Sequence, residues 1–222
     1  QRMGWVLTGA DVPEDGTLVV PDDYPTAAVL GPYAFMVEVD GEPLYQVADE
    51  PVRFAVRQDC APPGAMGIVM RSVKALADAT GQTFEFAGTF TGLPQRGNDR
   101  IEIGWAFDQQ FRFWEQGQGV QGETPEGVTI GWGGPDVIDE RGAQFLRGGF
   151  VLINADIGVP TTGGVGLTHE YVLLHELGHA MNLSHVRDVR EIMCPGEFEM
   201  APVALGPGDR TGLGVLGRRA LN

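Results

Sequence analysis

Apolar positions after residue 50 alternate with polar ones, or run without interruption, in five stretches of the chain. Both patterns are typical of β-strands, the first with one buried face and the second with two. Clusters of glycine, proline, asparagine and aspartate separate the stretches, as expected for turns. The predicted strands cover residues 52–56, 83–90, 100–107, 127–134 and 148–157.

A helix is predicted between the first two strands, at residues 67–80, because apolar residues recur there at helical spacing and Gly81 follows. This helix makes residues 51–90 a β-α-β unit. Its buried face is expected to contain Ile68, Met70, Val73, Leu76 and Ala77.

Two further helices are predicted in the C-terminal part of the chain. One begins near Thr168, a residue type that caps helix N-termini. The other covers residues 207–220, where Asp209 would cap the helix. Leu213 and Leu216 would then pack inward.

Residues 1–50 are rich in proline, glycine and aspartate. They contain short strand-like stretches at residues 17–20 and 33–39, and Asp-Gly follows the second. This pattern predicts a β-rich N-terminal extension or hairpin. A partly mobile extension is the alternative.

The composition is that of an ordinary globular protein, with 43% hydrophobic and 20% charged residues among 222. The length suits one domain with a full core, or a domain with an extension. No apolar run approaches the ~20 residues that span a bilayer. The net charge of −15 argues against nucleic acid and anionic membranes as partners, so we expect neither nucleic-acid binding nor membrane insertion. No signal peptide precedes Gln1, which is compatible with one that has been removed.

Residues 175–185, H-E-L-G-H-A-M-N-L-S-H, contain three of the four histidines of the chain. His175 and His179 project from one face of a helix and can bind the same metal ion. Glu176 sits beside them, placed to act on a metal-bound water. His185 reaches the same point only if the chain turns back, and Asn182 tolerates the left-handed conformation that such a turn needs. The string therefore predicts an open three-histidine zinc site.

The alternative is a histidine-rich helix whose imidazoles only form hydrogen bonds in the core. A third histidine at this spacing makes a chance occurrence of the motif much rarer. The fourth histidine, His169, lies nearly two helical turns before His175, which favours a surface or capping role over metal ligation.

Met193 follows His185 after eight residues, in the sequence E-I-M-C-P. Together with the histidine motif, this register resembles that of the metzincin metallopeptidases, with their extended zinc motif and Met-turn. The distance to Met193 and the presence of Pro195 most resemble the matrixin branch, including bacterial secreted peptidases. Branches that place a tyrosine at the position of Pro195 are disfavoured. One departure from the family pattern is Asn182, where metzincins usually have glycine.

The resemblance covers about residues 51–217 and implies an α+β or α/β protein of metzincin fold. That fold has a twisted, mixed five-stranded sheet, an active-site helix, a Met-turn and a C-terminal helix. Residues 1–50 would form the N-terminal extension and residues 51–222 the catalytic domain, with an upper part 51–185 and a lower part 186–222. Met193 would form a hydrophobic floor beneath the three imidazoles.

The implied function is that of a zinc-dependent endopeptidase. One catalytic Zn²⁺, held by His175, His179 and His185, would activate a water, and Glu176 would serve as general base. The partner would be a protein or peptide substrate that lies extended along the edge strand at residues 127–132. A monomer is expected. Calcium binding is possible, but no D-x-D-x-D-G loop assigns a site.

The motif is also compatible with two other functions: a non-catalytic zinc-bearing domain that binds peptides, and a zinc amidase that acts on a non-protein substrate. Glu176 argues against the first, because a binding domain needs no general base beside its metal. The Met-turn and the predicted edge strand favour peptide substrates over the second.

The chain has two cysteines, Cys60 and Cys194, which could form one disulfide between an early loop and the wall of the site. The alternative is a cysteine that caps the zinc, as in matrixin propeptides. Cys60 follows a predicted core strand and so does not lie in a detachable segment. The disulfide is favoured, and it predicts a secreted, extracellular protein.

Overall fold

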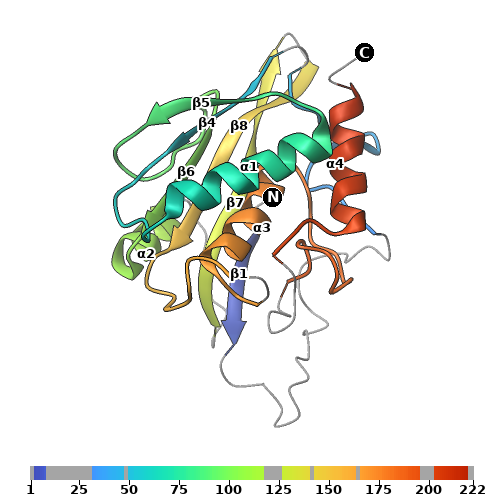
Figure 1. Ribbon diagram of the computed structural model, residues 1–222. Coiled ribbons are helices and arrows are strands. Elements are labelled where there is room, and N and C mark those ends of the chain that lie inside the picture. The colour runs from blue at the N-terminus through green and yellow to red at the C-terminus, as the bar shows by residue number, and fades with distance from the viewer. Residues whose placement is uncertain are drawn as a thin grey trace.

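The chain is built on one mixed six-stranded sheet, as a computed structural model shows (Figure 1). The structure describes residues 3–8, 32–47, 50–117, 127–140, 143–163, 166–195 and 203–219. The sheet order is β1-β7-β8-β6-β4-β5. Its strands are β1 (Met3–Thr8), β4 (Val52–Val56), β5 (Phe84–Thr89), β6 (Ile101–Ala106), β7 (Gly127–Glu140) and β8 (Ala143–Asn154).

All five strands predicted from the sequence are present, and the mixed sheet with its helices confirms the expected α+β class. The strands β5, β4, β6 and β8 run parallel, and β7 is antiparallel to β8. All six residues of β6 are buried, as expected for a strand that is covered on both faces. The sixth strand, β1, comes from the N-terminal segment and pairs antiparallel with β7.

Three helices lie over one face of the sheet: α1 (Ala65–Thr80), α3 (His169–Ala180) and α4 (Pro207–Arg219). In Figure 1, α1 crosses in front of the strands, α3 lies behind it, and α4 stands at its C-terminal end. Their apolar side chains form the main core with one face of the strands. Gly81 ends α1 in the left-handed conformation, and Leu213 and Leu216 of α4 are buried, as predicted.

The buried face of α1 differs from the prediction at two positions, Met70 and Ala77, of which Ala77 is only half-buried. Met70 is 49% exposed, whereas Ile68, Val73 and Leu76 are buried. The physical reason is helical geometry: Met70 lies two residues, or about 200°, from Ile68 and therefore points to the opposite side. Val69 takes its place in the core.

A fourth helix, α2 (Asp108–Gly117), covers the other face of the sheet and was missed by the sequence analysis. Alternate residues of β8 show the two faces: Val151 packs in the main core, and Phe150 packs in a smaller cluster with Phe111 and Trp114 of α2. The spacing of Phe111 and Trp114, three residues apart, was the available signal in an otherwise polar stretch.

The second part of the N-terminal segment, residues 32–47, is hydrogen-bonded to the rest of the chain. It contains a hairpin of β2 (Glu38–Val39) and β3 (Glu42–Pro43), turned at Asp40-Gly41, which agrees with the predicted hairpin. Residues 34–37 bind the turn at 182–184, and Val47 donates its N–H to the carbonyl of Leu146 in β8. The predicted strand-like stretch at 17–20 lies outside the described residues. The domain boundary at residue 50 stays a prediction.

Candidate metal centre

The helix α3 carries the first part of the histidine motif in a buried setting. Thr168 caps its N-terminus as predicted: the side-chain oxygen accepts a hydrogen bond from the N–H of Tyr171 at 3.0 Å. Every residue of α3 except Glu170 is buried. A helix buried on all sides has no polar face to explain its histidines and glutamate by solvent exposure. These polar residues therefore need another role.

The three motif histidines meet at one point. The Nε2 atom of His175 lies 3.0 Å from that of His179 and 3.2 Å from that of His185, and the last two are 3.1 Å apart. The chain returns His185 to the helix through Asn182, whose φ of 84° is the left-handed conformation predicted for this position. Ligands of a tetrahedral zinc with Zn–N bonds of ~2.0–2.1 Å are about 3.3 Å apart. The triangle therefore has the size that a zinc ion needs.

Backbone carbonyls set the tautomers of two of these imidazoles. The Nδ1 of His175 lies 2.6 Å from the carbonyl oxygen of Ile192, and that of His179 lies 2.8 Å from the carbonyl of Leu183. Because a carbonyl can only accept, both Nδ1 atoms must carry the proton. Both Nε2 atoms then present bare lone pairs to each other, an arrangement that is repulsive alone and favourable around a cation.

The surroundings also keep the histidines neutral. Burial lowers the pKa of His179 to about 4, and it lowers the pKa values of His175 and His185 well below the ordinary value. The neighbouring imidazoles add to this effect, because like charges at this distance repel: His179 and His185 lower the pKa of His175 further, and His179 lowers that of His185. Neutral imidazole is the form that binds metal, so the site is prepared for a cation at neutral pH.

Glu176 is fully buried on the side of α3 that packs against β7. A Cβ atom placed on Gly131 of β7 would lie 2.6 Å from its Oε1, so the carboxyl rests against this strand. Neither carboxyl oxygen has a hydrogen-bond partner among the described residues. Burial raises the pKa of the Glu176 carboxyl well above its ordinary value. A buried carboxyl with a raised pKa suits a group that takes up a proton during a reaction.

Met193 packs directly against the helix of the ligands. It is 1% exposed, and a Cβ atom on Gly178 would collide with its sulfur. Gly178 lies between His175 and His179 in α3, so only a residue without a side chain allows the sulfur this close to the cluster. This position agrees with the predicted floor beneath the imidazoles.

Asp209 holds the Met-turn from the first turn of α4. Its carboxylate accepts hydrogen bonds from the N–H groups of Ile192 at 2.6 Å, Gly206 at 2.8 Å and Met193 at 3.4 Å. The bond from Gly206 agrees with the predicted capping role, because it satisfies the N–H of the residue before α4. The bonds to Ile192 and Met193 were missed, since nothing in the sequence indicates which loop a capping residue also contacts.

The predicted Cys60–Cys194 disulfide is not formed. Cys60 lies in the loop between β4 and α1, where its thiol faces the side-chain oxygen of Gln110 in α2 at 3.6 Å. Cys194 is buried in the Met-turn, and its sulfur lies 3.9 Å from the carbonyl of Pro195. The two thiols face different surroundings, because the loop after β4 leads toward α2 and not toward the Met-turn. An extracellular location therefore has no support from a disulfide and stays a prediction.

His169 does not join the other histidines, as predicted. It is the first residue of α3, and its N–H donates to the carbonyl of Pro160. It is only 3% exposed, so the expected surface position was wrong, although a place at the helix start was right. Burial lowers the pKa of His169.

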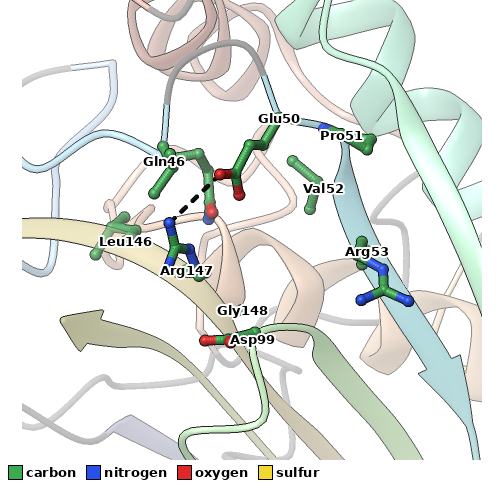
Figure 2. Close-up of a pocket in the computed structure, with 10 residues that line it drawn as sticks. Gln46, Glu50, Pro51, Val52, Arg53, Asp99, Leu146, Arg147 and Gly148 are labelled. Atoms are coloured by element: carbon green, nitrogen blue, oxygen red, sulfur yellow. Dashed lines mark hydrogen bonds and ion pairs between the residues drawn. The ribbon is translucent and has the colours of Figure 1, made fainter.

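A polar pocket lies between the start of β4 and residues 146–148 of β8 (Figure 2). None of the three motif histidines lines it. Its cations are paired with carboxylates: Arg147 with Glu50 at 3.5 Å, and Arg53 with Glu85 at 3.9 Å. The described residues that line it include no histidine or cysteine. The pocket is therefore separate from the three-histidine cluster.

No known protein family matches the chain, and no curated protein matches it by sequence. Solved structures align with much of it, including the following two. High choriolytic enzyme 1, a hatching-enzyme zinc protease from Oryzias latipes (medaka fish), is 11% identical with a TM-score of 0.42, and the match covers 83% of this chain and 99% of that one. Metalloproteinase-II from Bacteroides fragilis is 13% identical with a TM-score of 0.40, covering 78% of this chain and 56% of that one.

Among the described residues, no helix is both long and apolar enough to cross a membrane.

Proposed function

We propose that the protein is a zinc-dependent endopeptidase of the metzincin type. The observation that carries the proposal is the convergence of three Nε2 atoms within 3.0–3.2 Å of one another, beside a buried carboxyl with no other partner among the described residues. A structural cluster would not need Glu176 at this place, since a buried unpaired carboxyl destabilises a fold. Pro195 after the Met-turn supports the matrixin branch within this proposal.

His175, His179 and His185 would hold the ion through their Nε2 atoms. When bound, zinc supplies a positive charge that polarises a substrate carbonyl and lowers the pKa of water towards ~7. Glu176 takes the proton of the attacking water and then passes it to the nitrogen of the leaving amine. Its raised pKa makes both transfers feasible, because a weakly basic carboxylate would take up the proton only reluctantly. Met193 and the two backbone carbonyls keep the imidazoles in place.

The peptide would lie along β7, which passes next to Glu176 at Gly131. The predicted edge at residues 127–132 is covered in this structure, because β1 pairs with it from Thr8 opposite Gly127 to Met3 opposite Gly133. A substrate that adds to this edge must therefore displace the chain's own N-terminal strand. The metzincin resemblance also implies that residues 194–205, after Met193, would line the main specificity pocket; residues 196–202 of this segment lie outside the described part.

The decisive experiment is Glu176→Gln, assayed with denatured casein and followed by metal analysis. The amide is nearly isosteric but cannot take up the proton, so we expect cleavage to fall by roughly 10²–10⁴-fold with zinc content unchanged. Glu170→Gln is the matched control: it lies on the same helix, pairs with Arg71 at 2.7 Å on the surface, and should leave cleavage unchanged.

Parental cleavage by the Glu176→Gln protein would refute the mechanism. A parent protein that binds zinc and peptide without cleaving it would point instead to a peptide-binding domain. Cleavage of small amides but not of casein would point to an amidase.

A further inference from the structure

The turn between the second and third histidines is formed by a residue that departs from the metzincin pattern. Asn182 stands where that family usually has glycine, and its φ of 84° explains why glycine would be suitable. A non-glycine residue in this conformation carries a cost in strain, so its side chain should provide a compensating interaction. The side chain is fully buried.

All polar groups of this side chain are used to bind the N-terminal segment. The Oδ1 of Asn182 accepts a hydrogen bond from the N–H of Val37 at 2.9 Å. Its Nδ2 donates to the carbonyls of Val37 and Leu44, each at 3.0 Å. An amide offers two donor hydrogens, and both are satisfied. Asn182 therefore holds the two sides of the hairpin at residues 37–44 together.

The backbone around Asn182 is bound by the same segment. Met36 donates its N–H to the carbonyl of Asn182 at 3.0 Å, and Ser184 donates to the carbonyl of Ala34 at 2.8 Å. Leu183 lies between these two bonds and pairs with Phe35 as an isolated β-bridge. Its carbonyl accepts the Nδ1 proton of His179 at 2.8 Å. The peptide that orients His179 is thus fixed on both sides by residues 34–36.

We infer that Asn182 is a positioning residue of the metal centre: it anchors residues 34–44 on the ligand turn and so orients His179 through the carbonyl of Leu183. The inference rests on the proposed zinc site but not on peptide cleavage. It makes a segment some 140 positions away in the sequence part of the metal centre. The exchange of glycine for asparagine then has a purpose beyond the turn itself.

The test is Asn182→Gly, because glycine keeps the left-handed turn without strain and removes only the side-chain hydrogen bonds. Zinc affinity is measured by competition with a chelator. Loss of outer partners of metal ligands weakens binding by about 10–100-fold, and for a residue that acts through a carbonyl we expect about tenfold. Asp99→Gly is the matched control: Asp99 has a φ of 49° in a surface loop, and its exchange should leave zinc affinity unchanged.

Thermal unfolding with and without zinc separates positioning from simple stabilisation. A residue that only stabilises the fold lowers both melting temperatures equally, and Asn182→Gly should instead lower the zinc-bound one further. A zinc affinity within twofold of the parent, or equal shifts of both melting temperatures, would overturn the inference. A parent that binds zinc but cleaves no peptide would refute the proposed function and leave this result standing.

A second measurement needs no variant. Coupling between two parts of a protein is reciprocal, so zinc should increase the hydrogen-exchange protection of the amides of Met36, Val37 and Ser184 in the unmodified protein. The amide of Val47, which bonds to Leu146 in β8, is the internal control and should not respond. Equal responses of all four amides, or none, would contradict the inference.

Discussion

Two neighbouring histidines of one helix are oriented by opposite ends of the chain. His175 is held by the carbonyl of Ile192, whose own N–H binds Asp209 in the C-terminal helix. His179 is held by the carbonyl of Leu183, which residues 34–36 fix from the N-terminal side. We call these arrangements the C-terminal clamp and the N-terminal clamp. The comparison shows that a local ligand motif obtains its geometry from distant parts of the sequence.

The two clamps differ in charge. The C-terminal clamp depends on a carboxylate, whereas the N-terminal clamp depends on the neutral amide of Asn182. Hydrogen bonds to charged groups contribute about 1.5–3 kcal/mol, and those between neutral groups about 0.5–1.5 kcal/mol. Burial disfavours the ionised carboxylate on which the C-terminal clamp depends, since it raises the pKa of Asp209 to about 7. Three backbone N–H donors oppose this shift, because they stabilise the ionised form. We expect the C-terminal clamp to be the stronger one.

Acid should break the metal centre completely, regardless of the clamps. A proton and a zinc ion compete for the same Nε2 lone pair, and burial lowers the pKa of His179 to about 4. Proton competition in the folded protein therefore begins well below the ~6.5 of an exposed histidine. We expect zinc to be retained down to about pH 5 and lost near pH 4 or below, as measured by metal analysis after dialysis. Loss centred near pH 6.5 would show that the imidazoles are exposed to water.

Asp209→Ala should have the next largest effect, because it removes the C-terminal clamp. The substitution leaves three backbone N–H groups without their acceptor. Each of them that stays buried lowers the free energy of unfolding by about 1–3 kcal/mol. We expect the free energy of unfolding to fall by about 3 kcal/mol or more, and zinc affinity to fall by up to about 100-fold. Urea unfolding and chelator competition measure the two quantities.

Asp136→Ala is the control for this variant. Asp136 is also buried and accepts the N–H of Gly97 at 2.6 Å, but it lies on β7 beside the loop at residues 96–97 and not at the Met-turn. The Asp136→Ala protein should be less stable than the parent but bind zinc with the same affinity. If Asp209→Ala reduced zinc affinity no more than Asp136→Ala, or less than Asn182→Gly, the assigned order of the clamps would be wrong.

Removal of residues 1–8 should have the smallest effect and would divide the N-terminal region into its two parts. It frees the edge of β7 but leaves residues 34–44 in place. The five paired positions between β1 and β7 contribute a few tenths of a kcal/mol each, or about 1–2 kcal/mol in total. A substrate no longer has to overcome this pairing energy once β1 is removed, so KM for an extended peptide should fall by about tenfold. Zinc affinity should not change. An unchanged KM in a fully zinc-loaded protein would mean that substrate does not use this edge.

The sequence alone determined the parts of the molecule that depend on short-range order. The spacing of His175, His179 and His185 predicted their meeting point, because helix geometry and one left-handed residue fix it within eleven positions. Thr168, Gly81 and the five strands were likewise correct, since capping and alternation are local properties. The burial predicted for Met70 and Ala77 was wrong, and α2 was not predicted, because these features depend on which face of a helix meets the sheet.

Only the tertiary structure decided how the site is held and covered. The hydrogen bonds of Asn182 and Asp209 join positions that are far apart in the chain, and a single sequence carries no signal for such pairings. The same limit explains the incorrect disulfide, because two cysteines do not reveal where their loops lead. The pairing of β1 with the edge at residues 127–132 was likewise not predictable. An edge strand can pair with any segment that lies beside it, and the fold decides which segment that is.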